Sequence, residues 1–194
     1  MAFVGFKKAT IAVLNGELKV VATKKYVVEG KQGKGATSSF ELSGLSSEAV
    51  KVYGSDVAYY VVQDGVGDPN MKLNLLDLPF DIENEILGTL KKSEGLFLYG
   101  ETTKAPNVAI MLESKALNGE RVAVGIFNGK FSKDSMSGQT KEKSTPTPEP
   151  DEYTVAISAK TIDDKAQYVA KAIGDTAVAE LERLLFVDAT QDVT

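Results

Sequence analysis

The fold class is decided by the stretch Thr10-Ile11-Ala12-Val13-Leu14-Asn15-Gly16-Glu17-Leu18, which contains a strong β-hairpin signal. Asn-Gly between two apolar runs predicts a type I′ turn, because only a few residue types accept positive φ at both central positions. Residues 18–29 are rich in Val and predict the second strand. Asn118-Gly119 repeats the signal between predicted strands at 108–114 and 121–131. We therefore expect a chain built from sequential hairpins.

The remaining sequence adds further strands, which alternation or β-branched runs predict at residues 37–42, 57–63, 71–78, 95–99 and 153–160. The apolar run 57–63 is expected to be buried. Leu73, Leu75 and Leu78 are expected to face the core.

Helical segments are fewer. Ser46 or Ser47 is expected to cap a short helical turn through Val52. A longer helix is predicted from Asp81 to about Leu90, and a second over about 176–186.

These elements indicate a β-rich α+β class, since long βαβ alternation is absent. We expect a β-sandwich or partly open barrel of mainly antiparallel strands, with about nine strands and one or two flanking helices. Residues 1–194 are expected to form a single domain. It would carry an N-terminal arm (1–8), a Gly/Lys loop (30–36), a Pro-rich loop (143–152) projecting outward and the C-terminal helix.

The composition restricts the chemistry, because the chain of 194 residues has no Cys, His or Trp. Disulfides, thiolate nucleophiles and His-dependent catalysis are excluded, and zinc loses its favoured ligands. A reaction run by two carboxylates remains conceivable. We expect no enzyme activity, no cofactor and no metal.

The charge is unevenly distributed, with a net charge of −5 overall. Residues 1–35 contain seven Lys and two Glu, giving +5, so residues 36–194 carry −10. This asymmetry indicates complementary surfaces, either within the fold or between copies. The basic residues 1–35 could bind nucleic acid or simply form a solvated strand face. We favour the solvated face, because residues 36–194 are acidic and would repel nucleic acid. No targeting or membrane-spanning segment is expected.

Several motifs resemble functional sites only partly. Residues 30–37 have the glycine spacing of a phosphate loop, but Ala36 stands where its Lys is needed. Residues 64–70 lack the distal Glu of a calcium loop. The carboxylate pairs Glu83 with Glu85 and Asp163 with Asp164, and the aromatic groups at 59–60 and 97–99, are expected to be solvated or structural.

Two function classes remain open at this point. One is a structural protein that assembles with itself through strand edges and flexible arms. The other is a monomeric β-sandwich binding module of a cell-surface or carbohydrate-binding kind.

An ordered series of short segments resembles a known family, the major tail proteins of long-tailed, non-contractile phages of Gram-positive bacteria. The series covers roughly residues 3–160 in order. Its segments are Gly5-Phe6-Lys7-Lys8-Ala9, residues 24–30 and 44–53, Val57-Ala58-Tyr59-Tyr60, residues 75–80, Leu87-Gly88, residues 109–114 and residues 129–134.

The resemblance implies a tail-tube subunit of the virion without catalytic residues. Such proteins form hexameric rings that stack into a tube for DNA ejection. The implied partners are further copies, the tape measure, tail terminator and distal tail proteins, and DNA that passes without sequence-specific binding. No membrane is implied, and assembly would take place in the host bacterial cytoplasm. From their basic, flexible composition we expect the inter-ring contact residues to be Lys7, Lys8, Lys31, Lys34, Gly30, Gly33 and Gly35.

Overall fold

A computed structural model of the chain describes residues 3–136, 138, 140 and 149–188. In these residues it contains two helices, α1 (Phe80–Leu87) and α2 (Asp175–Leu185). The strands are β1 (Phe3–Leu14), β2 (Val20–Val28), β3 (Ala36–Ser43), β4 (Val50–Gly54), β5 (Val57–Val62), β6 (Asn70–Leu76), β7 (Leu90–Ser93), β8 (Leu96–Leu98), β9 (Val108–Ala116), β10 (Arg121–Ser132), β11 (Asp151–Ile157), β12 (Lys160–Ile162), β13 (Lys165–Gln167) and β14 (Val169–Ile173).

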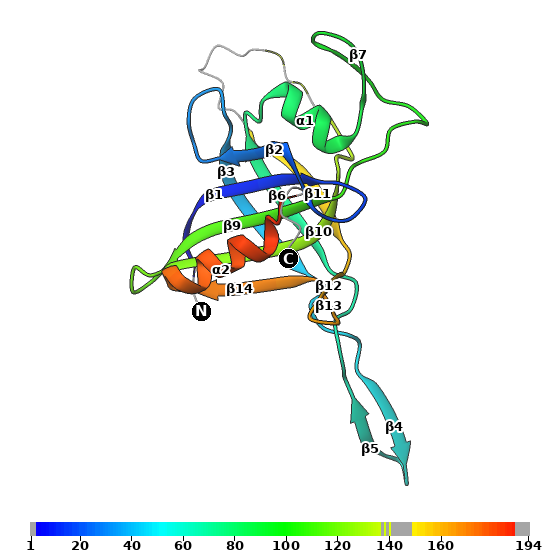
Figure 1. The fold of residues 1–194 in the computed structure, drawn as a ribbon. Helices are drawn as coiled ribbons and strands as arrows, with labels where there is room; N and C mark the ends of the chain where they lie inside the picture. Colours follow the sequence, from blue (N-terminus) through cyan, green and yellow to red (C-terminus); the bar gives the residue numbers. More distant parts are fainter. Residues whose placement is uncertain (1–2, 137, 139, 141–148, 189–194) are drawn as a thin grey trace.

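The body is one antiparallel sheet with the strand order β2-β1-β9-β10-β11-β6-β3, and β14 pairs with β10 beside this path (Figure 1). The edge strands β2 and β3 are consecutive in the sequence and are joined by a short loop. The sheet therefore curls around a core without closing into a barrel. The expected β-rich α+β class is confirmed.

The core lies inside the curled sheet, where alternate residues of β6 and β11 are buried and the central strands β9 and β10 are buried almost continuously. Ile11, Leu73, Ile110, Ile126 and Tyr153 are fully buried there. The expected core positions of Leu73, Leu75 and Leu78 are confirmed.

A second hydrophobic cluster lies on the outer face of the same sheet, under α2. Val178, Leu181 and Leu185 are buried and share one helix face. A Cβ at Gly125 of β10 would lie 2.7 Å from Leu185 Cδ1, so glycine permits the close approach of the helix. Because β9 is covered on both faces, it reads as the continuous apolar run Val108–Leu112.

The predicted hairpins at Asn15 and Asn118 are confirmed, but the predicted turn type is wrong. Positive φ occurs at Leu18 (58°) and Gly119 (85°), and not at both residues of either Asn-Gly pair. At the first turn, Asn15 Oδ1 accepts hydrogen bonds from the backbone N–H groups of Glu17 and Lys19, each at 3.0 Å. These side-chain bonds stabilise a longer turn than the two-residue loop that the dipeptide predicts.

Other local predictions also need correction. Residues 3–8 form the first half of β1 and not an arm, since Phe3 and Val4 pair with Ala116 and Lys115 of β9. Helix α1 starts after Pro79 and ends at Gly88, so Leu90 belongs to β7. Helix α2 follows Gly174 and confirms the C-terminal helix. Of the Pro-rich loop 143–152, residues 143–148 lie outside the described residues, and Asp151 and Glu152 begin β11.

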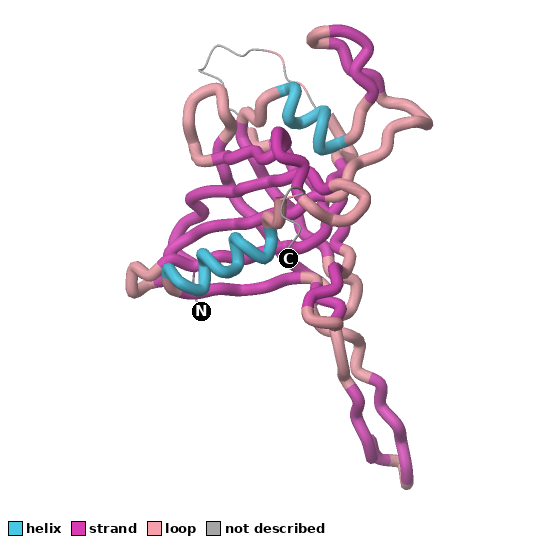
Figure 2. The backbone as a smooth tube through the Cα atoms, in the orientation of Figure 1, coloured by secondary structure: helices cyan, strands magenta, loops and turns pink. Residues whose placement is uncertain are grey.

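Two hairpins stand away from the sheet, β4–β5 and β7–β8 (Figures 1 and 2). They project from opposite ends of the molecule. The predicted helical turn from Ser46 or Ser47 through Val52 is wrong, because residues 50–54 are strand β4. The predicted burial of residues 57–63 is also wrong, because Val57 to Tyr60 of β5 are exposed.

Candidate assembly surfaces

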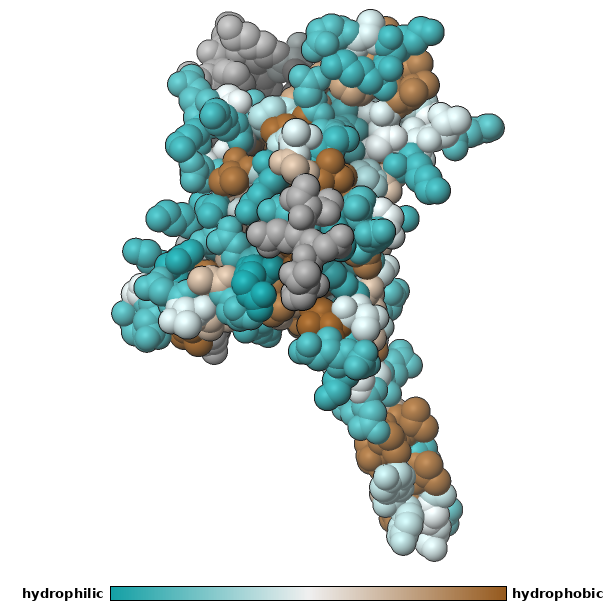
Figure 3. Space-filling view, viewed as in Figure 1, coloured by the Kyte–Doolittle hydropathy of each residue, from teal (hydrophilic) through white to brown (hydrophobic). Residues whose placement is uncertain are grey.

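The β4–β5 hairpin has an apolar surface that no other part of the described chain covers. Its turn, Ser55-Asp56, has φ of 53° and 62°, which is the two-residue geometry that β-hairpins favour. Seven of its large apolar residues are each more than half exposed: Val50, Val52, Tyr53, Val57, Tyr59, Tyr60 and Val61. Figure 3 shows this apolar surface beyond the hydrophilic body. Surfaces of this kind mark interaction sites.

Close backbone contacts fix the base of this hairpin. Gly67 N–H donates a hydrogen bond to the carbonyl of Gly44 (3.1 Å), and Gln63 Nε2 donates to the carbonyl of Ser47 (2.9 Å). Gly44 has φ +72°, and a Cβ there would lie 2.0 Å from the carbonyl oxygen of Asp68. The two connecting segments therefore leave the body side by side.

Further exposed apolar side chains lie on α1, on the β7–β8 hairpin and directly after it, at the other end of the molecule. We call this set the α1–β7–β8 patch; it consists of Phe80, Leu90, Leu96, Leu98 and Tyr99, each between 43% and 55% exposed. Phe80 contacts Phe97 edge to face, with 5.4 Å between ring centroids. This aromatic contact joins the hairpin to the helix.

Charged groups hold α1 on the sheet. Lys133 Nζ lies 2.7 Å from Glu83 Oε1 and 2.9 Å from Asp151 Oδ1, and only 7% of its side chain is exposed. Tyr153 donates a hydrogen bond to the same Glu83 oxygen at 3.0 Å. Burial by itself lowers the pKa of Lys133, but its two carboxylate partners outweigh burial and raise it.

The second anchor of α1 is Glu85, which accepts hydrogen bonds from Tyr26 and pairs with Lys24, both on β2. Burial and the Glu85 carboxylate raise the pKa of Tyr26. Glu83 and Glu85 therefore serve two separate clusters and do not face each other as a catalytic pair. The anchors give the α1–β7–β8 patch a fixed support.

The predicted contact residues fall into two groups. Gly30, Gly33, Gly35, Lys31 and Lys34 share the loop between β2 and β3, and all three glycines have positive φ. Lys31 pairs with Glu29 of the same loop. A Cβ at Gly30 or Gly33 would meet open space, whereas at Gly35 it would lie 3.3 Å from Val28 Cγ1.

Lys7 and Lys8 are adjacent on β1, at the end of a stretch where the pairing with β9 is irregular. Lys7 is exposed, with no ion pair in the part of the chain that the structure describes. Lys8 Nζ lies 2.6 Å from Glu113 Oε1. The pKa of Glu29 is lowered chiefly by its hydrogen bond with Lys31. The positive charges of Lys8 and Lys34 lower it further.

Several lysines of residues 1–35 form ion pairs with carboxylates from later in the same chain. Besides Lys8 with Glu113, Lys24 pairs with Glu85, and Lys25 Nζ lies 3.3 Å from Glu182 Oε1 on α2. The basic start of the chain therefore binds acidic groups from three later elements. Among the basic groups of residues 1–35, Lys7 and the Gly/Lys loop (30–36) therefore remain the candidates for contacts between copies.

The sequence reasoning missed both apolar surfaces. The signal for the first was the two-residue spacing at Ser55-Asp56 between the Val-rich runs 50–52 and 57–62. The described residues hold no group of three or more His, Cys, Asp or Glu side chains that could bind a metal ion. They also contain no helix that is long and apolar enough to cross a membrane.

This arrangement defines a β-rich α+β protein with exposed apolar side chains on two hairpins at opposite ends of a curled sheet. A family model described as phage tail tube protein matches residues 1–177, so the chain belongs to the phage tail tube protein family. The search of curated proteins found no match. The resemblance to tail proteins is thereby confirmed, and the match extends beyond residue 160 into the start of α2. The chain is a structural component of the phage tail tube.

Proposed function

We propose that the chain assembles with itself into hexameric rings, and that the rings stack into the tube through which DNA leaves the virion. The observation that carries this proposal is the β4–β5 hairpin, whose large apolar side chains are mostly exposed among the residues that the structure describes. An isolated two-stranded hairpin is at best marginally stable in water. Its surface therefore favours burial against another copy.

The position of the hairpin supports stacking in one direction. It projects from one end of the molecule, whereas the α1–β7–β8 patch and the Gly/Lys loop lie at the other (Figure 1). Contacts between unlike surfaces continue from copy to copy and generate rings or filaments. The tape measure, tail terminator and distal tail proteins are the proposed partners where the tube begins and ends.

The charge supports a conduit for DNA. Residues 36–194 carry −10, and much of the basic start is paired within the fold. A lumen lined by part of this acidic excess repels the phosphate backbone and keeps DNA from binding. Passage is then independent of DNA sequence. We propose assembly in the host bacterial cytoplasm, where the subunits are made.

The Gly/Lys loop, with Lys7, is our candidate for a polar contact between rings. Deleting residues 30–35 would leave a folded subunit that no longer stacks. The double substitution Lys31→Ser and Lys34→Ser is the gentler form, because it retains Gly35, which packs near Val28. We expect shorter tubes from both changes. Tubes of normal length from the deleted chain would contradict this contact.

Electron microscopy of the purified chain at high protein concentration tests the function. Rings and tubes are the expected result. The alternative function, a monomeric β-sandwich binding module, predicts a strict monomer that binds cell-surface glycans. The tyrosines of the β4–β5 hairpin are its most accessible candidates, since Tyr59 is 81% exposed.

A further inference from the structure

We propose that the β9–β10 turn of one copy, residues 117–120, fills a pocket beside the β1–β2 turn of its neighbour in the same ring. The inference rests on the proposed function, since it needs copies arranged in a ring. It names the two surfaces whose contact closes that ring.

The two surfaces lie at opposite ends of the central strands. At one end, Phe3 of β1 pairs with Ala116, directly before the β9–β10 turn. At the other end, Leu14 N–H donates a hydrogen bond to the carbonyl of Asn107 (2.8 Å), directly before β9. A strand rises about 3.3 Å per residue, so the nine residues of β9 hold the surfaces on the order of 25 Å apart. Figure 1 shows the two turns on opposite sides of the molecule.

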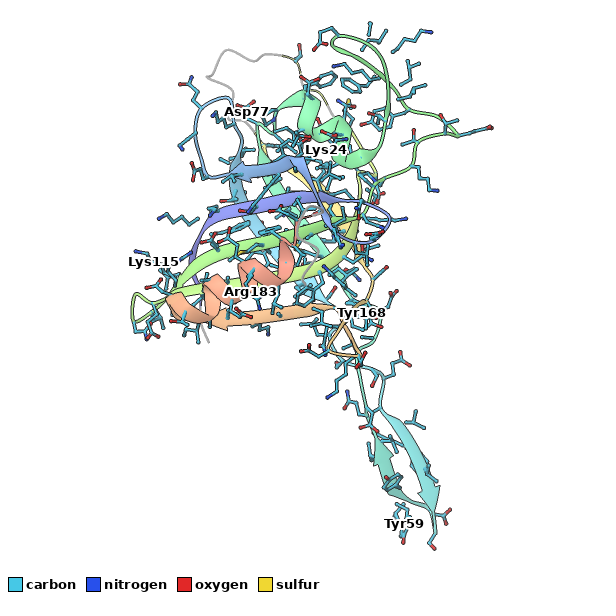
Figure 4. The ribbon with its side chains drawn as sticks, viewed as in Figure 1. Lys24, Tyr59, Asp77, Lys115, Tyr168 and Arg183 are labelled. Carbon is cyan, nitrogen blue, oxygen red and sulfur yellow. The ribbon has the colours of Figure 1, made fainter. Side chains whose placement is uncertain are left out.

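The β9–β10 turn presents one apolar side chain and one carboxylate. Leu117 is 81% exposed. Asn118 Nδ2 donates a hydrogen bond to Glu120 Oε2 (2.7 Å), which holds the carboxylate in place beside Leu117. Glu120 is exposed and has no ion pair within the described residues. Lys115, labelled in Figure 4, is also exposed on this end of β9, so the contact depends on the position of Glu120 and not on net charge.

The pocket beside the β1–β2 turn has matching chemistry. Leu14, Ala105 and Pro106 give it an apolar lining, and Lys104 and Lys130 add two ammonium groups. Its volume of about 240 Å³ lies below the roughly 300 Å³ at which small-molecule sites begin. A single side chain such as that of Leu117 is therefore a better occupant than a free ligand.

The two lysines of the pocket lack a carboxylate in their own chain. Among the described residues that line the pocket there is no Asp or Glu. Lys104 and Lys130 are exposed and have no ion pair in the described part of the chain. Glu17 of the nearby turn pairs with Lys19, at 3.5 Å. Glu120 of the neighbour supplies the missing negative charge while Leu117 occupies the apolar lining.

This contact joins two different surfaces of the chain. A contact between unlike surfaces that repeats with a fixed rotation closes into a ring. The turn and the pocket are both separate from the β4–β5 hairpin (Figure 1). Ring closure and stacking therefore use different parts of the subunit.

Cross-linking tests the contact directly, because the chain has no Cys of its own. A chain with Leu117→Cys and Ala105→Cys is assembled and treated with a short bismaleimide. The two positions lie at opposite ends of β9, so the reagent cannot join them within one copy. We expect a ladder of covalent products that ends at the complete ring. Leu117→Cys with Ser93→Cys, at the end of β7, is the control and yields no such ladder.

Reversing the charges is an independent test. Glu120→Lys places a third ammonium group against Lys104 and Lys130, and we expect this chain to lose its rings. Adding Lys104→Glu and Lys130→Glu to the same chain exchanges the charges of the two surfaces, and rings return. Light scattering measures the mass of each assembly, and circular dichroism checks that each variant is folded.

The remaining outcomes separate this inference from the proposed function. Rings that yield no Leu117–Ala105 product would overturn the inference and leave the tube function standing. Normal assembly of the Glu120→Lys chain would overturn it as well, and so would a loss that the exchanged charges do not restore. If the unsubstituted chain forms neither rings nor tubes, the proposed function fails and the inference fails with it.

Discussion

The ion pairs of Lys133 with Glu83 and Asp151 are single-residue contacts that hold α1 on the sheet. Lys133→Met removes the cation between Glu83 and Asp151, and Glu83 has only 14% of its side chain exposed. Breaking a buried pair from one side leaves an uncompensated charge, so we expect the free energy of unfolding to fall by about 3 kcal/mol. Urea unfolding followed by circular dichroism measures the change.

The matched control is Lys72→Met, which breaks a pair with Glu152 in which both side chains are 53% exposed. Exposed pairs contribute less than about 1 kcal/mol, so this variant stays close to the unsubstituted protein. Equal losses in the two variants would show that the Lys133 cluster does not hold α1.

Glu113 predicts a dependence of stability on pH. Burial by itself raises the pKa of Glu113, but hydrogen bonds from Lys8 and Arg121 outweigh it, so the pKa lies below its ordinary value of 4.5. The stability that this group adds is therefore present above pH 4.5 and is lost as the pH falls through the folded-state pKa.

The test compares Glu113→Gln with the unsubstituted chain by urea unfolding from neutral pH to about pH 3. We expect a lower free energy of unfolding in the variant at neutral pH, and a difference that shrinks as the solution is acidified. A difference that stays constant would contradict the assignment. Glu94→Gln, in a pair where the carboxylate is 85% exposed, is the control.

At the scale of the element, the base of the β4–β5 hairpin determines where the hairpin points. Gly44→Ala places a Cβ 2.0 Å from the carbonyl oxygen of Asp68 at positive φ, so the backbone must move. Gly54→Ala, within β4, brings its Cβ no closer than 3.6 Å to Tyr59. We expect Gly44→Ala to impair tube formation and Gly54→Ala to preserve it, as scored by electron microscopy. The reverse order would contradict the role given to the base.

The elements also show how far the sequence predicts this fold. The hairpins at Asn15 and Asn118 could be found, because Asn and Gly between apolar runs allow few other structures. The turn geometry could not, since the Asn15 side chain bonds the backbone of Glu17 and Lys19. Residues 57–62 look like a core strand, but five of the six are exposed. A strand that packs against another copy, as we propose for β5, needs the same apolar residues as a buried strand.

At the scale of the whole molecule, the sequence could not show which charged residues far apart in the chain form ion pairs. Lys8 meets Glu113, and Lys25 meets Glu182, across most of the chain. The charge asymmetry predicted that complementary surfaces exist, but it could not separate pairs within the fold from contacts between copies. The curled sheet makes that separation, because it brings β1 against β9 and places β2 near α2.

The most direct measurement of the central claim is electron microscopy of a chain without the β4–β5 hairpin. Residues 45–66 are replaced by a short Gly/Ser linker, which can close because Gly67 N–H already bonds the carbonyl of Gly44. The account predicts a folded subunit that forms no stacked tubes under conditions where the unsubstituted chain does. Tubes of normal length from the shortened chain would contradict the claim that this hairpin drives assembly.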